Sequence, residues 1–189
     1  MILEGTAWKF GDDIGATALV SSRYDKEGMG RQWDECAKHV LEDKDAGFAA
    51  KVKKGDILTT GENLGMGHAH YYMAAIKGSE AAGLSALLGE SVNVLFQREA
   101  IDAGVPCWSF KGLADMVETG NELRINLATG EAVNLTTGEK RQFEPVSPIV
   151  LDILGAGGSR NWAMMRIGRN DLTRRTSDQD GAQQKANPA

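Results

Sequence analysis

Residues 56–72 constrain the fold of this chain more than any other stretch. They begin as a short apolar and β-branched run, pass through three glycines within positions 61–67, and then become alanine-rich with helical spacing. This order predicts a strand, a glycine-containing loop and a helix. Glycine lets a backbone approach a ligand closely, and the N–H groups at a helix start attract carboxylates or phosphates. His68 and His70 stand where that helix is expected to begin, so the loop is a candidate functional site.

The patterns on either side extend this unit. A strand is predicted over 2–10 and a helix over 32–41, where apolar residues recur at helical spacing. After the loop, the patterns predict helix, strand, helix and strand over 71–82, 84–88, 91–103 and 105–110. Ser91 is the expected N-cap of the helix over 91–103. Strands that alternate with helices pair in parallel, so the centre of the fold is predicted to be an α/β unit.

The pattern changes after this unit. Residues 121–127 and 132–136 alternate between apolar and polar and are punctuated by Thr-Gly pairs, which predicts small antiparallel hairpins. A last short helix is expected over 148–154, with proline at its start and glycine after its end. Polar residues dominate the end of the chain. We therefore expect one domain over 1–168 and a disordered tail over 169–189.

Composition excludes several classes of function. The net charge of −5 and the scattered lysines and arginines give no reason to expect nucleic acid or a membrane as partner. No stretch is long and apolar enough to span a membrane, and the start of the chain does not resemble a signal peptide, so a cytoplasmic location is expected. Cys36 and Cys107 are far apart, which predicts two reduced core thiols rather than a disulfide, zinc or iron–sulfur site.

Several segments in series resemble one family. Residues 8–14, 38–43, 51–57, 61–67, 100–106 and 134–139 look like the small subunit of 3-isopropylmalate dehydratase, the swivelling domain of the aconitase superfamily. The resemblance covers roughly residues 8–157. It implies a swivelling β/β/α domain of the α/β class, with a mixed sheet, flanking helices and small β-hairpins.

The resemblance also implies a partner and a cofactor. In this family a large subunit holds a 4Fe–4S cluster, and the active site lies between the two subunits of a heterodimer or heterotetramer. The unligated iron acts as a Lewis acid on the hydroxyl and carboxylate of a small hydroxy dicarboxylic acid, while the small subunit contributes a base and anion-binding groups. With two separated cysteines, this chain is expected to hold no such cluster itself.

The departures from the family fall at the site. The family loop reads Gly-Cys-Gly-Ser-Ser-Arg-Glu, in which a serine is the catalytic base and the arginine binds a substrate carboxylate. Here Met66 replaces the cysteine, His68 and Ala69 replace the serines, and His70 and Tyr71 replace the arginine and glutamate. The usual catalytic serine and arginine therefore cannot be transferred to this chain.

An earlier family pattern, Asp-Ile-Asp-Thr-Asp, is also broken. Asp13 and Ile14 are kept, but Gly15, Ala16 and Thr17 follow. Arg23 matches by position a segment that helps to select the substrate in the family, although a solvated surface arginine is an equal alternative.

One interpretation of the altered loop retains catalysis. His68 is then the base, because imidazole transfers protons near neutral pH, and a protonated His70 partly replaces the arginine. A helix start lowers the pKa of a histidine, which favours His68 as base and counts against His70 as cation. The backbone amides of residues 65–69 are the expected anion site. The candidate substrate-binding residues are Thr17, Arg23, Gly65, Met66, Gly67, Ala69 and Tyr71.

Other interpretations stay open. In one of them, the substrate differs from isopropylmalate or is bound by arginines such as Arg23 or Arg31. In another, the loop has lost catalysis and the chain is a structural or binding subunit. His68 and His70 form a metal pair, although no third ligand is visible nearby. Asp12 and Asp13 are equally well explained as turn formers.

Overall fold

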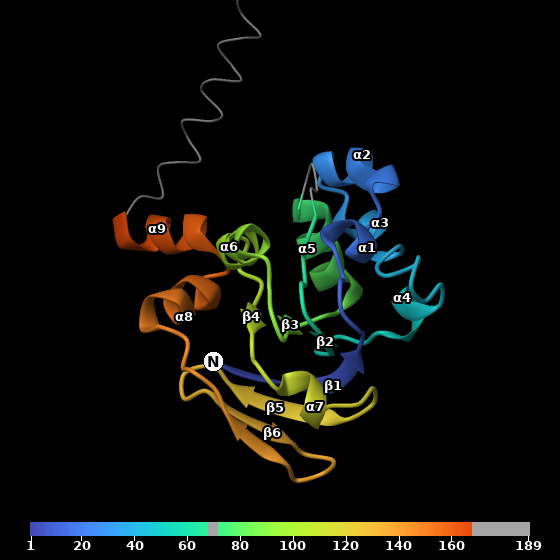
Figure 1. Cartoon of the computed structure of the whole chain (residues 1–189). Helices are drawn as coiled ribbons and strands as arrows, with labels where there is room; N and C mark the ends of the chain where they lie inside the picture. The colour runs from blue at the N-terminus through green and yellow to red at the C-terminus, as the bar shows by residue number, and fades with distance from the viewer. Residues whose placement is uncertain (68–71, 168–189) are drawn as a thin grey trace, which may run out of the picture.

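The computed structural model describes residues 1–67 and 72–167 and places a seven-stranded sheet at the centre of the molecule (Figure 1). The strand order is β4-β3-β2-β1-β5-β6-β7. Neighbours from β1 to β4 pair in parallel, whereas β1 with β5, β5 with β6 and β6 with β7 pair antiparallel. The strands are β1 (Ile2–Lys9), β2 (Ile57–Thr60), β3 (Ala86–Gly89), β4 (Cys107–Ser109), β5 (Glu122–Asn126), β6 (Glu131–Asn134) and β7 (Lys140–Gln142). The predicted mixed sheet of the α/β class is confirmed.

Helices surround the parallel half of this sheet. Figure 1 shows α1, α2, α3 and α5 gathered at one side of the molecule and α8 with α9 at the other. The helices described are α1 (Ala16–Leu19), η1 (Ser22–Tyr24), α2 (Asp25–Met29), α3 (Trp33–Ala37), α4 (Phe48–Lys51), α5 (Tyr72–Ala82), α6 (Val94–Asp102), α7 (Leu113–Met116), α8 (Pro148–Gly155) and α9 (Ser159–Ile167). The predicted tail over 169–189 lies outside the described residues.

Two predicted helix boundaries were wrong. The helix expected over 32–41 ends at Ala37, because the chain turns there and Leu41 takes a positive φ of 54° while its N–H donates to the carbonyl of Leu19. The N-cap of α6 is Asn93 rather than Ser91, since the Asn93 side chain accepts bonds from two N–H groups of the first turn. The Ser91 hydroxyl instead accepts a bond from the backbone N–H of Asn63.

The core divides into two layers, one on each face of the sheet. Every residue of β2 and β3 is buried, as expected for parallel strands covered on both faces. Leu58 and Leu87 face the layer beneath α5 and α6, where Ile76 and Phe96 are fully buried. The residues next to them along the strands face the second layer, which includes Ile57, Ala86, Leu88, Phe110, Leu123, Ile125 and Leu154. Burial on both faces therefore holds the ends of β2 and β3 in place.

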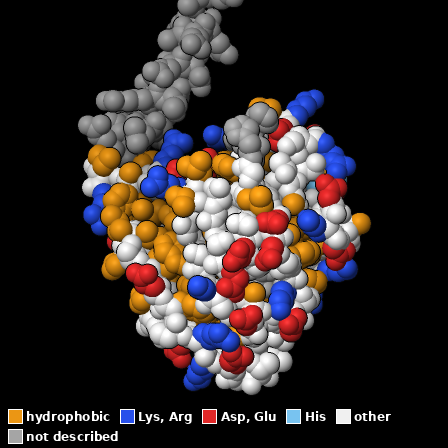
Figure 2. All heavy atoms as spheres, in the orientation of Figure 1, with side chains coloured by type: hydrophobic (Ala, Val, Ile, Leu, Met, Phe, Trp, Pro, Cys, Tyr) orange, Lys and Arg blue, Asp and Glu red, His pale blue; other side chains and the backbone are white. Residues whose placement is uncertain are grey.

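The side of the molecule formed by α8 and α9 exposes apolar side chains. Figure 2 shows hydrophobic groups gathered on the side where these two helices lie. Ile149, Met165 and Ile167 are among the exposed large hydrophobic residues. Arg166 is exposed, with its guanidinium over the ring of Trp162.

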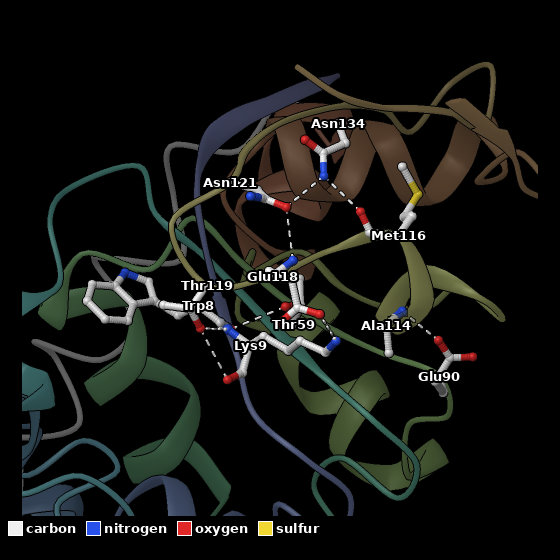
Figure 3. Close-up of polar contacts among 10 residues, drawn as sticks. All are labelled: Trp8, Lys9, Thr59, Glu90, Ala114, Met116, Glu118, Thr119, Asn121 and Asn134. Atoms are coloured by element: carbon white, nitrogen blue, oxygen red, sulfur yellow. Dashed lines mark hydrogen bonds and ion pairs between the residues drawn. The ribbon is translucent and has the colours of Figure 1, made fainter. Parts of the chain in front are cut away.

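A buried asparagine ties the antiparallel strands to the rest of the domain (Figure 3). The Asn134 amide donates to the carbonyl of Met116 at 2.7 Å and to Asn121 Oδ1 at 2.8 Å. Its own Oδ1 accepts bonds from the backbone N–H groups of Thr136 and Thr137. Asn134 is fully buried, so its side chain is satisfied only by these partners, which join the hairpin after β6 to the connection between α7 and β5.

Substitution of Asn134 tests this connection. Asn134→Ala leaves buried donors and acceptors unpaired, and we expect the free energy of unfolding to fall by about 3 kcal/mol, as for the loss of several buried hydrogen bonds. Chemical denaturation of the purified chain measures the change. The matched control is Asn161→Ala, an exposed asparagine in α9, which should change stability by no more than about 0.5 kcal/mol. Equal effects of the two substitutions would contradict this role of Asn134.

Candidate functional site

Three loops meet where the parallel strands β1, β2 and β3 end. We call residues 10–15 the first loop, residues 61–67 the glycine loop and residues 90–93 the third loop. The first loop and the glycine loop are joined by backbone hydrogen bonds from Gly61 to Gly11, from Asp13 to Glu62 and from Gly65 to Ile14, at 2.8 to 3.1 Å. This edge of a parallel sheet is the usual place for a ligand in an α/β fold, and here its backbone is fixed.

The third loop holds the glycine loop from the other side. The N–H of Leu64 donates to the carbonyl of Ser91 at 3.0 Å, and the N–H of Asn93 donates to the carbonyl of Leu64 at 2.8 Å. The Ser91 hydroxyl accepts the N–H of Asn63 at 2.8 Å. The glycine loop is therefore bonded on both flanks to loops that leave neighbouring strands.

The acidic side chains of the first loop take part in this framework. Asp12 Oδ1 accepts the N–H of Glu62 at 2.8 Å, and Asp13 Oδ1 accepts the amide of Asn63 at 2.9 Å. Both bonds cross to the glycine loop instead of closing a local turn. Asp13 and Asn63 each have a positive φ, of 59° and 66°, a conformation that aspartate and asparagine tolerate better than most residues. These acids act as structural links between two loops.

Gly65 is required where the glycine loop passes over α6. Its φ is +72°, and a Cβ at this position would overlap the ring of Phe96, which is fully buried. Only a residue without a side chain fits that approach. The ring of Phe96 also packs edge-on against Tyr72, with centroids 5.7 Å apart. The glycine loop and the start of α5 thus rest on the same aromatic side chain.

The structure describes part of the predicted site. Gly65, Met66 and Gly67 lie in the glycine loop, and Ala16 donates to the carbonyl of Met66 at 3.2 Å, which brings α1 and the exposed Thr17 to the loop. The predicted site residues His68, Ala69, His70 and Tyr71 lie outside the described residues.

Two amides of the predicted anion site already have partners. The N–H of Gly65 donates to the carbonyl of Ile14, and the N–H of Met66 donates to the carbonyl of Asn63 at 3.2 Å. These two groups stabilise the loop and do not point to a ligand. An anion site built from backbone amides would have to begin at Gly67 or beyond.

Arg23 belongs to a different cluster of charges. Its guanidinium lies 2.7 Å from Asp43 Oδ1 and 3.7 Å from Glu42 Oε1, and its Nε donates to the Ser21 hydroxyl. The hydrogen bond and the charge of Asp43 raise the pKa of Arg23. Binding of a substrate carboxylate would have to compete with these two carboxylates. Arg31, the other candidate arginine, is exposed and has a positive φ of 55°.

The sequence patterns did not reveal that residues of the third loop support the glycine loop. Asn93 caps α6 and Ser91 binds the glycine loop, and both types of residue are favoured at N-caps. The sequence therefore offers two candidates for one cap, separated by a single residue. Asn63 carried a weak signal, because asparagine tolerates a positive φ better than most residues.

The cysteines do not fit an iron–sulfur cluster. Cys36 and Cys107 are both buried and unpaired, and they belong to α3 and β4. Burial raises the pKa of the Cys107 thiol, and burial together with the charge of Glu27 raises the pKa of Cys36, so both thiols disfavour the thiolate form that binds metal. Within residues 1–67 and 72–167, no three histidine, cysteine or acidic residues are placed to hold a metal ion.

The same part of the chain has no helix long and apolar enough to cross a membrane.

Comparison with known proteins finds relatives whose names agree with one another. No family model matches the chain. The 3-isopropylmalate dehydratase small subunit of Thermodesulfovibrio yellowstonii is 35% identical over 173 residues, which cover 91% of this chain and 99% of that protein. The isopropylmalate/citramalate isomerase small subunit of Methanocaldococcus jannaschii is 38% identical over 157 residues, or 83% of this chain and 90% of that protein. A crystal structure of 3-isopropylmalate dehydratase from the same archaeon aligns with a TM-score of 0.79 at 30% identity, over 88% of this chain and 95% of that one.

A glycine series tests how the loop is held. Gly65→Ala adds both a strained φ and a clash with Phe96, and we expect it to lower the free energy of unfolding by about 3 kcal/mol. Gly67→Ala is expected to add the strain alone, because its φ is +90° and no atom of the described residues lies within 4 Å of a Cβ there, and should cost about 1 to 2 kcal/mol. Gly11→Ala meets neither obstacle and serves as the control. Denaturant titration of the three variants measures the order, and a Gly65→Ala variant as stable as Gly11→Ala would rule out the close approach.

Proposed function

This chain belongs to the family of 3-isopropylmalate dehydratase small subunits, and from that membership we propose that it completes the active site of a hydro-lyase together with a large subunit that holds a 4Fe–4S cluster. The observation that carries the proposal is the similarity over nearly the whole length of both chains, 91% of this one and 99% of the relative from Thermodesulfovibrio yellowstonii. The name of that relative, a small subunit, supports a larger partner for this chain. The cytoplasm is the proposed location.

The proposal assigns the cluster to the partner because the two cysteines of this chain do not suit it. Its two cysteines are buried in separate elements with raised pKa values. The contribution of this chain is then limited to positioning, proton transfer and contacts with the substrate. Its glycine loop suits such a role, because seven residues that leave a buried strand are bonded on both sides to neighbouring loops.

His68 is proposed as the base. It follows Gly67 directly in the sequence, and the chain is anchored on both sides of residues 68–71, since the Tyr72 hydroxyl donates to the carbonyl of Gly67 at 3.1 Å and its ring packs on Phe96. An imidazole accepts a proton near neutral pH without the help that a serine hydroxyl needs. His70 is proposed as a second polar contact to the substrate.

The proposed substrate class is a small hydroxy dicarboxylic acid, which the enzyme dehydrates, hydrates or isomerises. Isopropylmalate and citramalate are the first compounds to test, because relatives carry these names. The replacement of the family's serines and arginine in this chain makes a related acid a reasonable second choice. A structural or binding role without catalysis is the alternative that the experiments below would reveal.

Isolation of the chain with its partner tests the assembly. A tagged chain purified without air from its own cells should bring down a larger subunit in constant ratio, and the complex should show the broad brown absorbance of an iron–sulfur cluster. Incubation of the complex with 2-isopropylmalate or citramalate should produce the absorbance of an unsaturated acid. A colourless chain that purifies alone under conditions that preserve labile clusters would refute the proposal.

Substitution of His68 tests the base. In the purified complex, His68→Ala should lower kcat by about 10² to 10⁴-fold, the usual contribution of a general base, with assembly unchanged on gel filtration. The control is His39→Gln, since His39 is the one histidine of this chain apart from His68 and His70 and its Nδ1 lies 2.6 Å from Glu42. The control should keep its turnover. Normal turnover in His68→Ala would assign the base to another residue and favour a binding role for the loop.

A further inference from the structure

A cavity lies where the two edges of the sheet approach each other. Strands β4 and β7 are the outermost in the sheet order, yet residues from both line one cavity of about 540 Å³, which we call the seam cavity. The ring of Phe110, directly after β4, packs against the ring of Phe143, directly after β7, with centroids 4.5 Å apart. Of the described residues that line the seam cavity, only Glu90 belongs to one of the three loops of the candidate site. The seam cavity is therefore a separate feature of the fold.

The charge of Glu90 is already used within the protein. One oxygen of its carboxylate accepts the backbone N–H of Gly112 at 2.5 Å, and the other accepts the N–H of Ala114 at 2.7 Å. Figure 3 shows the second of these bonds. Hydrogen bonds from N–H groups to a carboxylate offset its charge. Glu90 thus supports the wall of the seam cavity, and the charges available to a ligand come from other residues.

Two opposite charges remain at the seam cavity. Lys111 follows β4 and Glu144 follows β7, and both are exposed and line the cavity. Among the described residues, neither forms an ion pair within 4.0 Å. Arg141, which lies beside Gly112, is instead paired with Glu139 at 2.8 Å. The seam cavity therefore offers one amine and one carboxylate that are not paired with each other.

Neutral polar side chains supply further hydrogen-bond acceptors. Gln97 Nε2 donates to the carbonyl of Cys107 at 3.2 Å, and Gln142 Nε2 donates to the carbonyl of Thr129 at 2.6 Å. Because these bonds to the described backbone engage the amide nitrogens, the amide oxygen is the acceptor that each side chain still offers. Ser109 adds an exposed hydroxyl to the lining. This set of acceptors favours a ligand group that carries several N–H donors, such as an ammonium group.

Aromatic rings form the apolar part of the lining. Trp108 and Phe143 both line the seam cavity and are partly buried against the second layer of the core. Packing against the core holds both side chains in place before a ligand arrives. A flat apolar group gains from contact with such rings, through burial and through the preferred geometries of aromatic pairs.

We propose that the seam cavity binds a free α-amino acid with an aromatic or other large apolar side chain. The ammonium group of the amino acid pairs with Glu144 and the amide oxygens, and its carboxylate pairs with Lys111. Its side chain packs against Trp108 and Phe143. A zwitterion satisfies both charges of the cavity at once, whereas a ligand with a single charge leaves one of them unpaired and meets a like charge. This second site does not depend on the proposed function.

Ligands that differ in one charged group test the site. L-Phenylalanine, 2-phenylethylamine and 3-phenylpropionate share a phenyl group, but the amine lacks the carboxylate and the propionate lacks the ammonium group. Titration of each into the purified chain, labelled with nitrogen-15 and followed by NMR, gives the Kd and the backbone amides that shift. L-Phenylalanine should bind about tenfold more tightly than either analogue, because each lacks one ionic contact, and more tightly than L-alanine, which lacks the ring. The shifts should centre on residues 107–112 and 142–144.

Removal of either charge should affect the ligands differently. Lys111→Met should weaken L-phenylalanine by about tenfold and leave 2-phenylethylamine bound at least as tightly, because the amine has no carboxylate to pair. Glu144→Gln should weaken both L-phenylalanine and 2-phenylethylamine by about tenfold and should not weaken 3-phenylpropionate. The matched control is Lys26→Met, which removes an exposed lysine from α2, an element outside the described lining of the cavity. The control should leave all three Kd values unchanged.

The possible results separate the parts of this inference. A preference for L-phenylalanine that falls in Lys111→Met and Glu144→Gln but not in Lys26→Met would support it. Equal binding of L-phenylalanine and either analogue would overturn the amino-acid assignment, because one charged group would then contribute nothing. No binding of L-phenylalanine at millimolar concentrations, or shifts centred on other residues, would overturn the site itself. Because the chain is titrated alone and turnover is not measured, none of these results changes the standing of the proposed function.

Discussion

The structure depends on strand β1 pairing in two directions at once. On one side it pairs in parallel with β2, and on the other it pairs antiparallel with β5. The parallel half ends in the three loops of the candidate site, and the antiparallel half closes the sheet beneath it. Because the first loop leaves directly from β1, the place of Asp12 and Asp13 beside the glycine loop follows from the register of this strand.

Local patterns predicted the parts of the fold that local interactions determine. The order of strand, glycine loop, helix and strand from residue 56 onward was correct, because apolar periodicity and glycines act over a few residues. Among the short helices between β1 and β2, only α3 was predicted from such a period, and it ends earlier than expected. The chain there is held by distant contacts, such as the bond from Leu41 to Leu19 and the edge-on packing of Phe48 against Trp8 and Phe10. No window of sequence contains these partners together.

In the candidate site, too, local features were predictable from the sequence and distant contacts were not. The glycine loop was recognisable because Gly61, Gly65 and Gly67 imply unusual backbone geometry. The pairing of Arg23 with Asp43 could not be read from the sequence, because it joins two turns that only the fold brings together. The sequence likewise did not show that the backbone amides of Gly65 and Met66 already have hydrogen-bond partners within the protein. A loop that resembles a family motif therefore indicates a candidate site, but not which of its backbone groups are free to take part.

The central place of β1 also affects how the chain is made. The ribosome synthesises β1 long before its partner β5, because Ile2 pairs with Asn126, far along the chain. Until that partner emerges, one edge of β1 stays open to pairing with other chains. Contacts between such distant residues slow folding and prolong exposure of unpaired strands. Production of this chain should therefore depend on chaperones and on the rate of translation more than its size alone suggests.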